Sequence, residues 1–255
     1  MNFSIKRWHW IVLGVVVYLT FLIAYIPAIY VASIVEKQSN GEVRLYNVSG
    51  TLFEGNASVL EAKGVRINNL DWTLSPWALL IARASLDIQG GAMRDAEQIY
   101  IDTDASIKLF SPEHFTLSDT TLLVPAKSAL SQFALPIAVT AEGRFRLDLE
   151  KLKMHPQCTD LQGKGAWLNA EIEMPQRAVN LGSFEANMSC ADGAFTVQVL
   201  PENSLQLEAD IVVDVTGDYS IDGTFKPDDS LPQDIQLGAE SFFSKNEQGF
   251  YIISL

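Results

Sequence analysis

The chain has 255 residues, of which 48% are hydrophobic and 19% are charged, and its formal net charge is −13. This composition excludes a disordered tail, because the apolar content is sufficient for a hydrophobic core. The acidic balance excludes nucleic-acid binding as the main activity, since such proteins contact phosphates through clustered Lys and Arg. We expect one membrane segment and one or two modest domains.

The first predicted element is a single transmembrane helix over residues 11–35, a run without formal charge. As a helix this run would be about 37 Å long, which is enough to cross a hydrocarbon core of about 30 Å. Lys6 and Arg7 precede it, and positive charges are retained in the cytoplasm. We therefore predict that residues 1–10 are cytoplasmic and that residues 36–255 lie on the other side.

Two features qualify this helix. Pro27 lies inside the apolar run, and because proline lacks a backbone N–H we expect a kink or an early helix end there. A cleaved signal peptide is the alternative interpretation. Its apolar region would normally be about 7–15 residues long, and this difference favours an uncleaved anchor.

The chain beyond residue 40 alternates apolar and polar residues with a period of two. The clearest segments are 144–149, 195–199, 205–209, 219–225 and 250–253. Because Gly, Pro, Asn and Asp separate these segments, the pattern predicts half-buried strands joined by turns. The fold is therefore predicted to be mainly β, an antiparallel sheet that is strongly curved or resembles an open barrel.

One short helix is predicted within the β region, over residues 75–84. Ser75 would be its N-cap, and Pro76 would occupy the first helical position, where its missing N–H costs nothing. Residues 50–57 with Trp72 also resemble residues 163–170 with Phe184 at a similar spacing. This likeness suggests two β halves, 40–130 and 137–255, although short Gly and Ala matches also occur by chance.

Cys158 and Cys190 are the only cysteines, and both lie beyond the membrane segment. In an oxidising compartment we expect them to form a disulfide, worth roughly 3 to 4 kcal/mol in the loop-entropy model. The alternative is a metal site that combines Cys158 with His155. Too few ligands lie nearby in the sequence for a closed zinc site, so the disulfide is favoured.

The sequence offers no convincing catalytic motif. It lacks the Gly-x-Ser-x-Gly and Walker patterns, and Gly163-Lys164-Gly165 supplies only the first two glycines of a dinucleotide fingerprint. His114 and His155 are interpreted as exposed loop residues, because a general base requires a precisely placed partner. We predict no catalytic residue, no metal and no cofactor.

The most distinctive residues lie in two stretches, 48–57 and 70–80. In chain order they are Gly50, Thr51, Phe53, Gly55, Trp72, Pro76 and Trp77. Preceded by an N-terminal anchor, this order resembles the family of type II secretion system protein N, and Gly163 and Trp167 also fit. The resemblance covers nearly the whole chain, although Phe53 stands where a Trp is expected.

The resemblance implies a noncatalytic inner-membrane component with a periplasmic β domain. Such a protein would contact other type II secretion components and assist the assembly or stability of the machinery. In the motif, we expect the glycines to permit a tight turn and Leu52, Phe53, Trp72 and Trp77 to supply burial. The alternative is a carrier of a hydrophobic ligand such as lipid, because the Gly-rich aromatic segments also resemble AsmA-type periplasmic proteins.

Overall fold

Nearly every strand of the protein pairs with the next strand along the chain. The computed structural model describes residues 7–62, 64–130, 140–173 and 177–254. These residues form one 14-stranded antiparallel sheet in which β1 pairs with β3 and the order then follows the sequence to β14, while β2 pairs with β3 outside this path. The predicted mainly-β antiparallel fold is confirmed, and the sheet is open.

The strands differ greatly in length. The longest are four neighbours in the middle of the sheet, whereas the terminal strands are short. In chain order the strands are β1 (Val43–Tyr46), β2 (Ser49–Gly50), β3 (Glu54–Ala62), β4 (Val65–Leu74), β5 (Arg83–Gly90), β6 (Tyr100–Lys108), β7 (Ser111–Pro125), β8 (Thr140–His155), β9 (Gln157–Glu173), β10 (Ala178–Ala191), β11 (Ala194–Val199), β12 (Glu208–Val213), β13 (Tyr219–Phe225) and β14 (Tyr251–Ser254).

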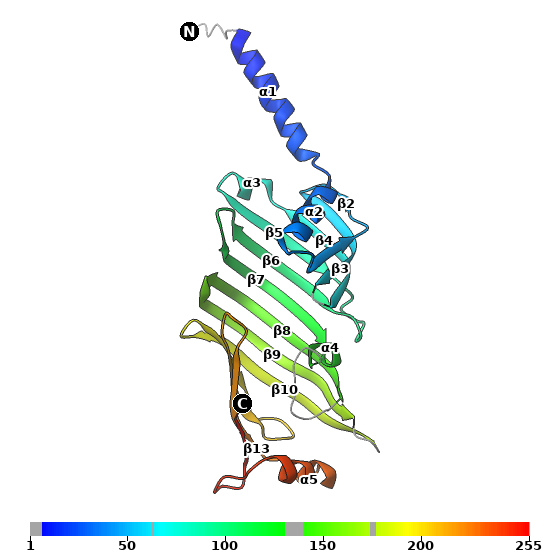
Figure 1. Cartoon of the computed structure of the whole chain (residues 1–255), viewed down its shortest axis with the longest axis vertical. Helices are drawn as coiled ribbons and strands as arrows, with labels where there is room; N and C mark the ends of the chain where they lie inside the picture. Colours follow the sequence, from blue (N-terminus) through cyan, green and yellow to red (C-terminus); the bar gives the residue numbers. More distant parts are fainter. Residues whose placement is uncertain (1–6, 63, 131–139, 174–176, 255) are drawn as a thin grey trace.

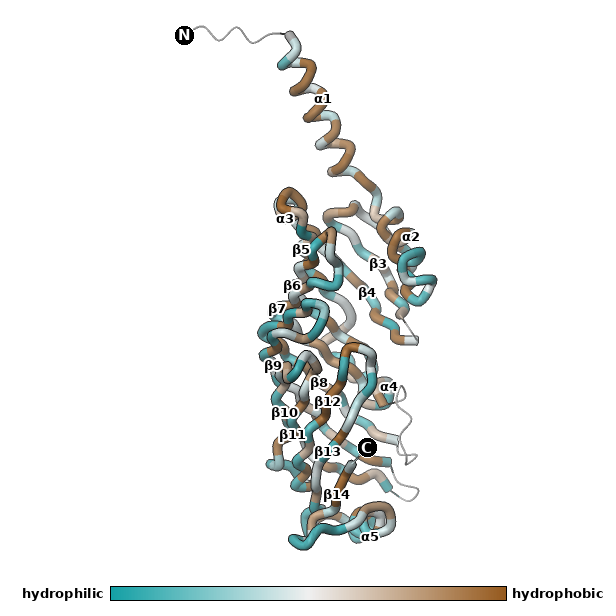
Figure 2. Tube along the Cα trace, turned by 60° about the vertical axis from the view of Figure 1, so that its left-hand side comes forward, coloured by the Kyte–Doolittle hydropathy of each residue, from teal (hydrophilic) through white to brown (hydrophobic). Residues whose placement is uncertain are grey.

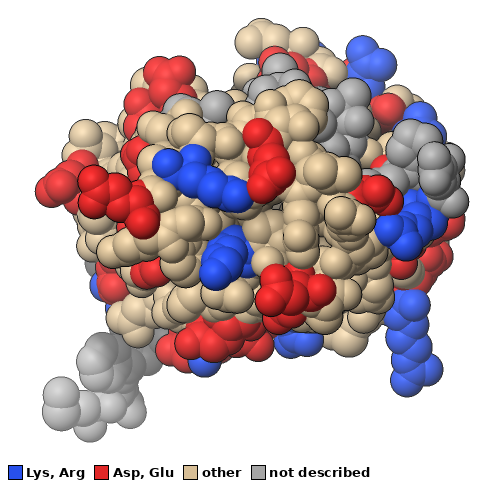
Figure 3. Space-filling view, turned by 90° about the horizontal axis from the view of Figure 1, so that it is seen from below, with Lys and Arg blue, Asp and Glu red and all other residues tan. Residues whose placement is uncertain are grey.

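The sheet is elongated and strongly curved. Figure 1 shows β5–β10 side by side along the long axis, with β13 turned away from the direction of β8–β10. Helix α1 (Arg7–Ala24) projects from one end, and α5 (Gln233–Phe242) lies at the other. Figure 2 shows α1 as a largely hydrophobic segment. At the end farthest from α1, acidic groups gather at several places with basic groups scattered among them (Figure 3).

The predicted continuous helix over residues 11–35 is wrong in its extent. The chain forms α1 and then α2 (Ala28–Gln38), with a break at Pro27, whose φ of −64° and ψ of 139° are extended. There the chain joins the sheet, since Pro27 forms a bridge with Thr51 and Ile26 O accepts the Leu52 N–H at 2.8 Å. The early helix end expected at the proline is confirmed. Among the described residues, no helix combines the length and apolar character needed to span a membrane.

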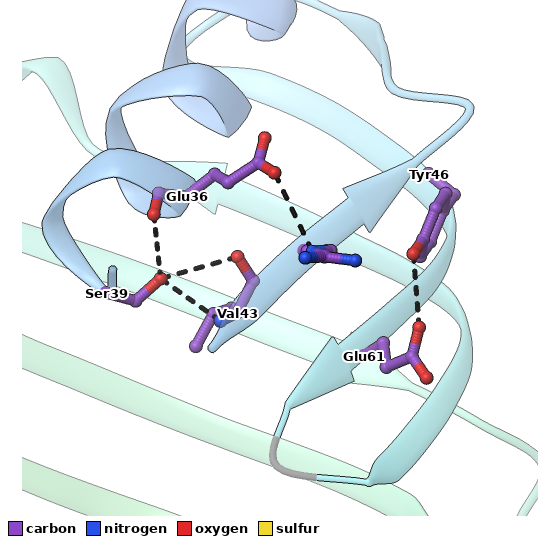
Figure 4. Close-up of polar contacts among 6 residues, drawn as sticks. Glu36, Ser39, Val43, Tyr46 and Glu61 are labelled. Carbon is purple, nitrogen blue, oxygen red and sulfur yellow. Dashed lines mark hydrogen bonds and ion pairs between the residues drawn. The ribbon is translucent and has the colours of Figure 1, made fainter. Parts of the chain in front are cut away.

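Helix α2 packs on the first strands of the sheet. Ala28 and Ala32 are buried, and Ala28 belongs to a core cluster with Ala57, Leu70 and Trp72. At the helix end, the Ser39 hydroxyl donates to Glu36 O at 3.2 Å and accepts the Val43 N–H at 3.1 Å, which connects α2 directly to β1 (Figure 4). Local hydrogen bonds of this kind therefore fix the angle between the helix and the sheet.

Most of the predicted strands are confirmed. Segments 144–149, 195–199 and 219–225 lie within β8, β11 and β13, and β14 covers most of 250–253. The strand predicted over residues 205–209 is wrong, because β12 begins only at Glu208. Before it, Asn203 Oδ1 accepts the N–H groups of Leu205 and Leu207, and Gln206 has a φ of 44°, which is incompatible with a strand.

The helix predicted over residues 75–84 is also too long. Helix α3 spans only Pro76–Leu79, and Arg83 already begins β5. Ala82 has a φ of 57°, so the chain turns into the left-handed region and cannot continue as a helix.

The predicted halves 40–130 and 137–255 belong to one sheet. Strands β7 and β8 pair from Phe115 opposite Met154 to Pro125 opposite Arg144, across the expected boundary. The boundary itself, at residues 131–139, lies outside the described residues. A duplication of one β unit stays a prediction.

Candidate functional site

An apolar groove with a volume of about 440 Å³ opens on one face of the sheet between β7 and β12. Its lining comes from the six strands β7 to β12, from α4 (Ala126–Leu130) and from the turn before β12. Cross-strand neighbours share a face of a sheet, so a row of apolar side chains forms wherever the register aligns them. The main lining side chains are Val124, Leu130, Phe145, Leu147, Trp167, Leu181, Phe184, Met188, Val197, Leu205, Leu207 and Ile211.

Three aromatic side chains form one wall of the groove. Phe145, Trp167 and Phe184 are opposite one another on β8, β9 and β10. The ring centroids of Phe145 and Trp167 are 5.5 Å apart, as are those of Trp167 and Phe184. The Trp167 Nε1–H donates to Glu142 O at 3.0 Å, which fixes the indole. The wall is therefore rigid and preorganised for apolar contact.

Small residues form the floor of the groove. Gly165 on β9 lies opposite Ala186 of β10 on one side and opposite Leu147 of β8 on the other. Trp167 of the aromatic wall follows two residues later on the same strand. A Cβ at Gly165 would meet Met188 Sδ at 3.7 Å and Ala186 Cβ at 3.8 Å, which are ordinary contacts. The space above Gly165 is therefore unfilled by the protein itself.

The predicted disulfide between Cys158 and Cys190 is present beyond one end of the groove. The β9–β10 pairing ends at Gly163 and Met188, and the disulfide joins the two strands past that point. Cys158 is buried in a cluster with neighbouring apolar residues of β8 and β9. The bond therefore holds together strand ends that ladder hydrogen bonds no longer connect.

Cys158 is bonded to Cys190, so its thiolate is not available for the alternative metal site with His155. The part of the chain that the structure describes contains no group of three or more His, Cys, Asp or Glu residues arranged to hold a metal ion. His155 and His114 lie at the ends of strands β8 and β7, not in loops as expected, and their ring centroids are 4.8 Å apart. The register of β7 with β8 brings them together, which no local sequence signal indicates.

These histidines belong to a basic pocket of about 270 Å³ on the opposite face of the sheet. Arg83, Lys108 and Lys153 line it with His114 and His155, and Lys108 Nζ lies 3.5 Å from His114 Nδ1. Desolvation, followed by the positive charges of His114, Lys108 and Lys153, lowers the pKa of His155 below its usual value. This electrostatic environment favours an anion.

The first motif stretch lies far from the groove, at the end of the sheet near α2. Gly50 has a φ of 89°, in a turn where Thr51 Oγ1 accepts the Glu54 N–H at 3.2 Å. Trp72 is buried, its ring covers Gly55, and its Nε1–H donates to Leu52 O at 3.3 Å. The expected structural role of these residues therefore has a clear geometric basis.

Other expected site residues have different surroundings. Phe53 is half-buried, and Pro76 is the first residue of α3. The expected burial of Trp77 is wrong, because its side chain is 78% exposed at the tip of α3. Gly163 allows close packing, since a Cβ there would approach Leu149 Cδ2 to 2.6 Å. Arg7 is the first residue of α1, and Lys6 lies outside the described residues.

The model of the family described as "Type II secretion system (T2SS), protein N" matches residues 41–254. The chain belongs to this family. The protein of this name from Vibrio cholerae is 26% identical over 217 residues, 82% of each chain. That from Aeromonas hydrophila is 26% identical over 241 residues, 93% of this chain and 92% of the relative.

A third family member, from Klebsiella pneumoniae, is 24% identical over 239 residues, 91% of this chain and 88% of the relative. No solved structure matches the chain. The resemblance seen in the sequence is thus confirmed over nearly the full length, and the chain is a component of a type II secretion system.

Proposed function

We propose that the protein is a noncatalytic component of the type II secretion machinery, held at the inner membrane and assisting the assembly or stability of the apparatus that exports folded proteins from the periplasm. The observation that supports a location at the membrane is the exposed apolar surface of α1. Its large apolar side chains, from Trp8 to Ile23, are 43% to 71% exposed. So much exposed apolar surface on one helix is unfavourable in water and favours contact with lipid.

The proposed topology places the N-terminus in the cytoplasm and the β domain in the periplasm. Arg7 begins α1 and Lys6 precedes it, which is the charge distribution of a cytoplasmic flank. The Cys158–Cys190 disulfide supports the periplasmic side for the sheet, because such bonds persist in oxidising compartments. The acidic groups at the end far from α1 (Figure 3) suit contacts with basic surfaces of other secretion components.

Membrane fractionation with mild crosslinking of the full chain tests this proposal. We expect the protein in the inner-membrane fraction, crosslinked to secretion subunits. The double variant Val16→Asp, Leu19→Asp should leave that fraction, whereas the matched control Val16→Leu, Leu19→Ile should remain. Recovery of the protein without any secretion subunit would contradict the assembly role, and an unchanged location of the charged variant would contradict the tether.

A second candidate function is the binding or carriage of a hydrophobic ligand such as lipid. The specific observation is the groove, whose lining is almost entirely apolar and whose aromatic wall is fixed by neighbouring strands. Preformed apolar grooves of this kind are typical ligand sites. An apolar segment of a partner subunit is the other occupant that such a groove suits, and its binding would serve the assembly role.

Native mass spectrometry of the full chain, released from mild detergent, distinguishes these two occupants. Gly165→Leu places a side chain directly in the groove, whereas Lys164→Leu adds the same side chain at the adjacent exposed position on the other face. A lipid carrier should retain lipid in the wild type and in Lys164→Leu and lose it in Gly165→Leu. A lipid-free wild type would contradict the carrier function.

A further inference from the structure

The largest exposed apolar side chains of the sheet domain gather at one edge. Phe110 is 89% exposed, Trp77 is 78% exposed and Leu80 is 77% exposed, the three highest values among large apolar residues that the structure describes. The neighbouring Ile81 is 69% exposed. An isolated exposed apolar residue is ordinary, but a contiguous group of large ones marks an interaction surface.

These residues come from two neighbouring turns. Trp77, Leu80 and Ile81 lie in and just after α3, and Phe110 lies in the turn between β6 and β7. The Leu109 N–H donates to Ala82 O at 3.1 Å, which ties one turn to the other. We call this group the α3 edge: Trp77, Leu80, Ile81, Leu109 and Phe110.

Basic residues lie directly beside the α3 edge. Arg83 and Lys108 are cross-strand partners on β5 and β6, one residue from Ala82 and Leu109 respectively. They line the basic pocket together with His114, Lys153 and His155, and none of the described residues that line it is acidic. Lys153 Nζ lies 3.7 Å from Asp160 Oδ2, outside the pocket lining. In a chain of net charge −13, this is a local concentration of positive charge next to an apolar edge.

The α3 edge also lies at the end of the molecule that carries α1. In Figure 1, α3 is at the same end of the sheet as α1, and α1 leans toward the side on which α3 lies. Figure 2 shows α3 and the adjoining turn as a hydrophobic tip in the direction of α1. A membrane that surrounds α1 would therefore approach the α3 edge.

We propose that the α3 edge docks on the anionic phospholipid surface of the membrane that holds α1, with the apolar tips among the headgroups and Arg83 and Lys108 against lipid phosphates. This inference rests on the proposed tether. Tryptophan and phenylalanine beside basic residues are typical of surfaces that lie in the headgroup region. Lysine and arginine near the surface add attraction to anionic lipid.

Docking would hold the sheet at a defined angle to the bilayer. A tether made of α1 alone connects the domain to the membrane only through the short segment between Ala24 and Ile26, whereas a second contact at the α3 edge would restrict the orientation of the sheet. The ends of the groove strands would then have a fixed position relative to the lipid surface.

Tryptophan fluorescence of the full chain tests the proposal. The protein is reconstituted in vesicles of phosphatidylethanolamine and phosphatidylglycerol, with and without brominated acyl chains that quench nearby indoles. Trp77→Phe isolates the Trp77 contribution, and because Trp77 is exposed the variant should fold normally. We expect brominated lipid to quench the fluorescence of Trp77. An aqueous quencher such as acrylamide should leave the fluorescence of Trp77 unchanged.

The charge requirement is tested with Arg83→Gln, Lys108→Gln, against Lys164→Gln as a matched control on the same outer face. The double variant should regain Trp77 fluorescence in brominated vesicles, and the control should not. A Trp77 contribution that resists brominated lipid but is quenched by acrylamide would overturn the docking. That result would still support the tether if Trp8 and Trp10 were quenched, and the absence of any quenching would count against the tether itself.

Discussion

The apolar face of the sheet is covered in one region of the molecule and open in another. In the covered region, formed by β1–β5 with α2, the helix packs on the sheet and Ala28, Ala57 and Trp72 are buried together. In the open region, formed by β8–β12, the side chains of the same face line a groove. The difference shows that a regular alternating pattern produces a core where another element covers it and a binding surface where none does.

Two glycines show how local this difference is. At Gly55 a Cβ would collide with the Trp72 ring, so the missing side chain is replaced by an aromatic from the next strand. A Cβ added at Gly165 would have its nearest neighbours at 3.7 Å and 3.8 Å. The Trp167 ring is not among them, so it does not cover this glycine. One glycine makes room for packing inside the protein, and the other leaves room for something else.

The largest expected effect tests the covered region. Trp72→Ala should lower the free energy of unfolding by about 3–5 kcal/mol, because it empties the centre of a filled core. Trp167→Ala should cost less, since Trp167 borders open space. Denaturant unfolding of the full chain in mild detergent measures both. Equal losses would show that the groove wall is as much a core as the covered region.

The disulfide tests how the open region is held without a covering helix. Cys158→Ser with Cys190→Ser should lower the free energy of unfolding by about 3 to 4 kcal/mol, because the bond closes a long loop. Hydrogen exchange should accelerate in β9 and β10 and remain unchanged in β3 and β4. Uniform acceleration would mean that the two regions unfold as one unit.

Alanine substitutions at Gly55 and Gly165 compare the covered and open regions directly. Gly55→Ala should destabilise the protein by about 1–3 kcal/mol, because the new methyl group must displace the Trp72 ring. Gly165→Ala should instead stabilise it by about 0.5–1 kcal/mol, since alanine suits a strand better than glycine and has room here. Thermal unfolding of the two variants measures the difference, and a destabilised Gly165→Ala would mean that the groove is filled.

The smallest expected effect is a pH dependence on the outer face of the open region. Hydrogen bonds from Arg146, and then from Thr121, lower the pKa of Asp148 below its usual value. The folded state therefore favours the ionised carboxylate of Asp148. This preference stabilises the protein fully above the usual aspartate pKa, and the stabilisation is lost as the pH falls from the usual aspartate pKa to the lower pKa of the folded state.

Hydrogen exchange in β8, followed from about pH 5 down to about pH 2, checks this dependence. Exchange rates corrected for intrinsic pH effects should rise in β8, and Asp148→Asn should remove the rise. Because both partners are partly exposed, the effect should be small and weaker at high salt. A rise that persists in Asp148→Asn would assign it to other carboxylates.

Local patterns in the sequence determined much of this protein. Period-two alternation predicted antiparallel strands, and Pro27 predicted the helix end. The presence of two cysteines beyond the apolar run predicted a disulfide between them. These features depend on backbone chemistry and on near neighbours, which a single sequence contains. The motif residues likewise sufficed to indicate the family.

The tertiary structure alone decided which surfaces are covered. It placed α2 over Trp72, left Trp77 exposed, and brought His114 to His155 through the register of β7 and β8. Alternation specifies which residues share a face, but what lies against that face depends on contacts between segments far apart in the chain. For that reason the groove and the α3 edge are visible only in the folded protein.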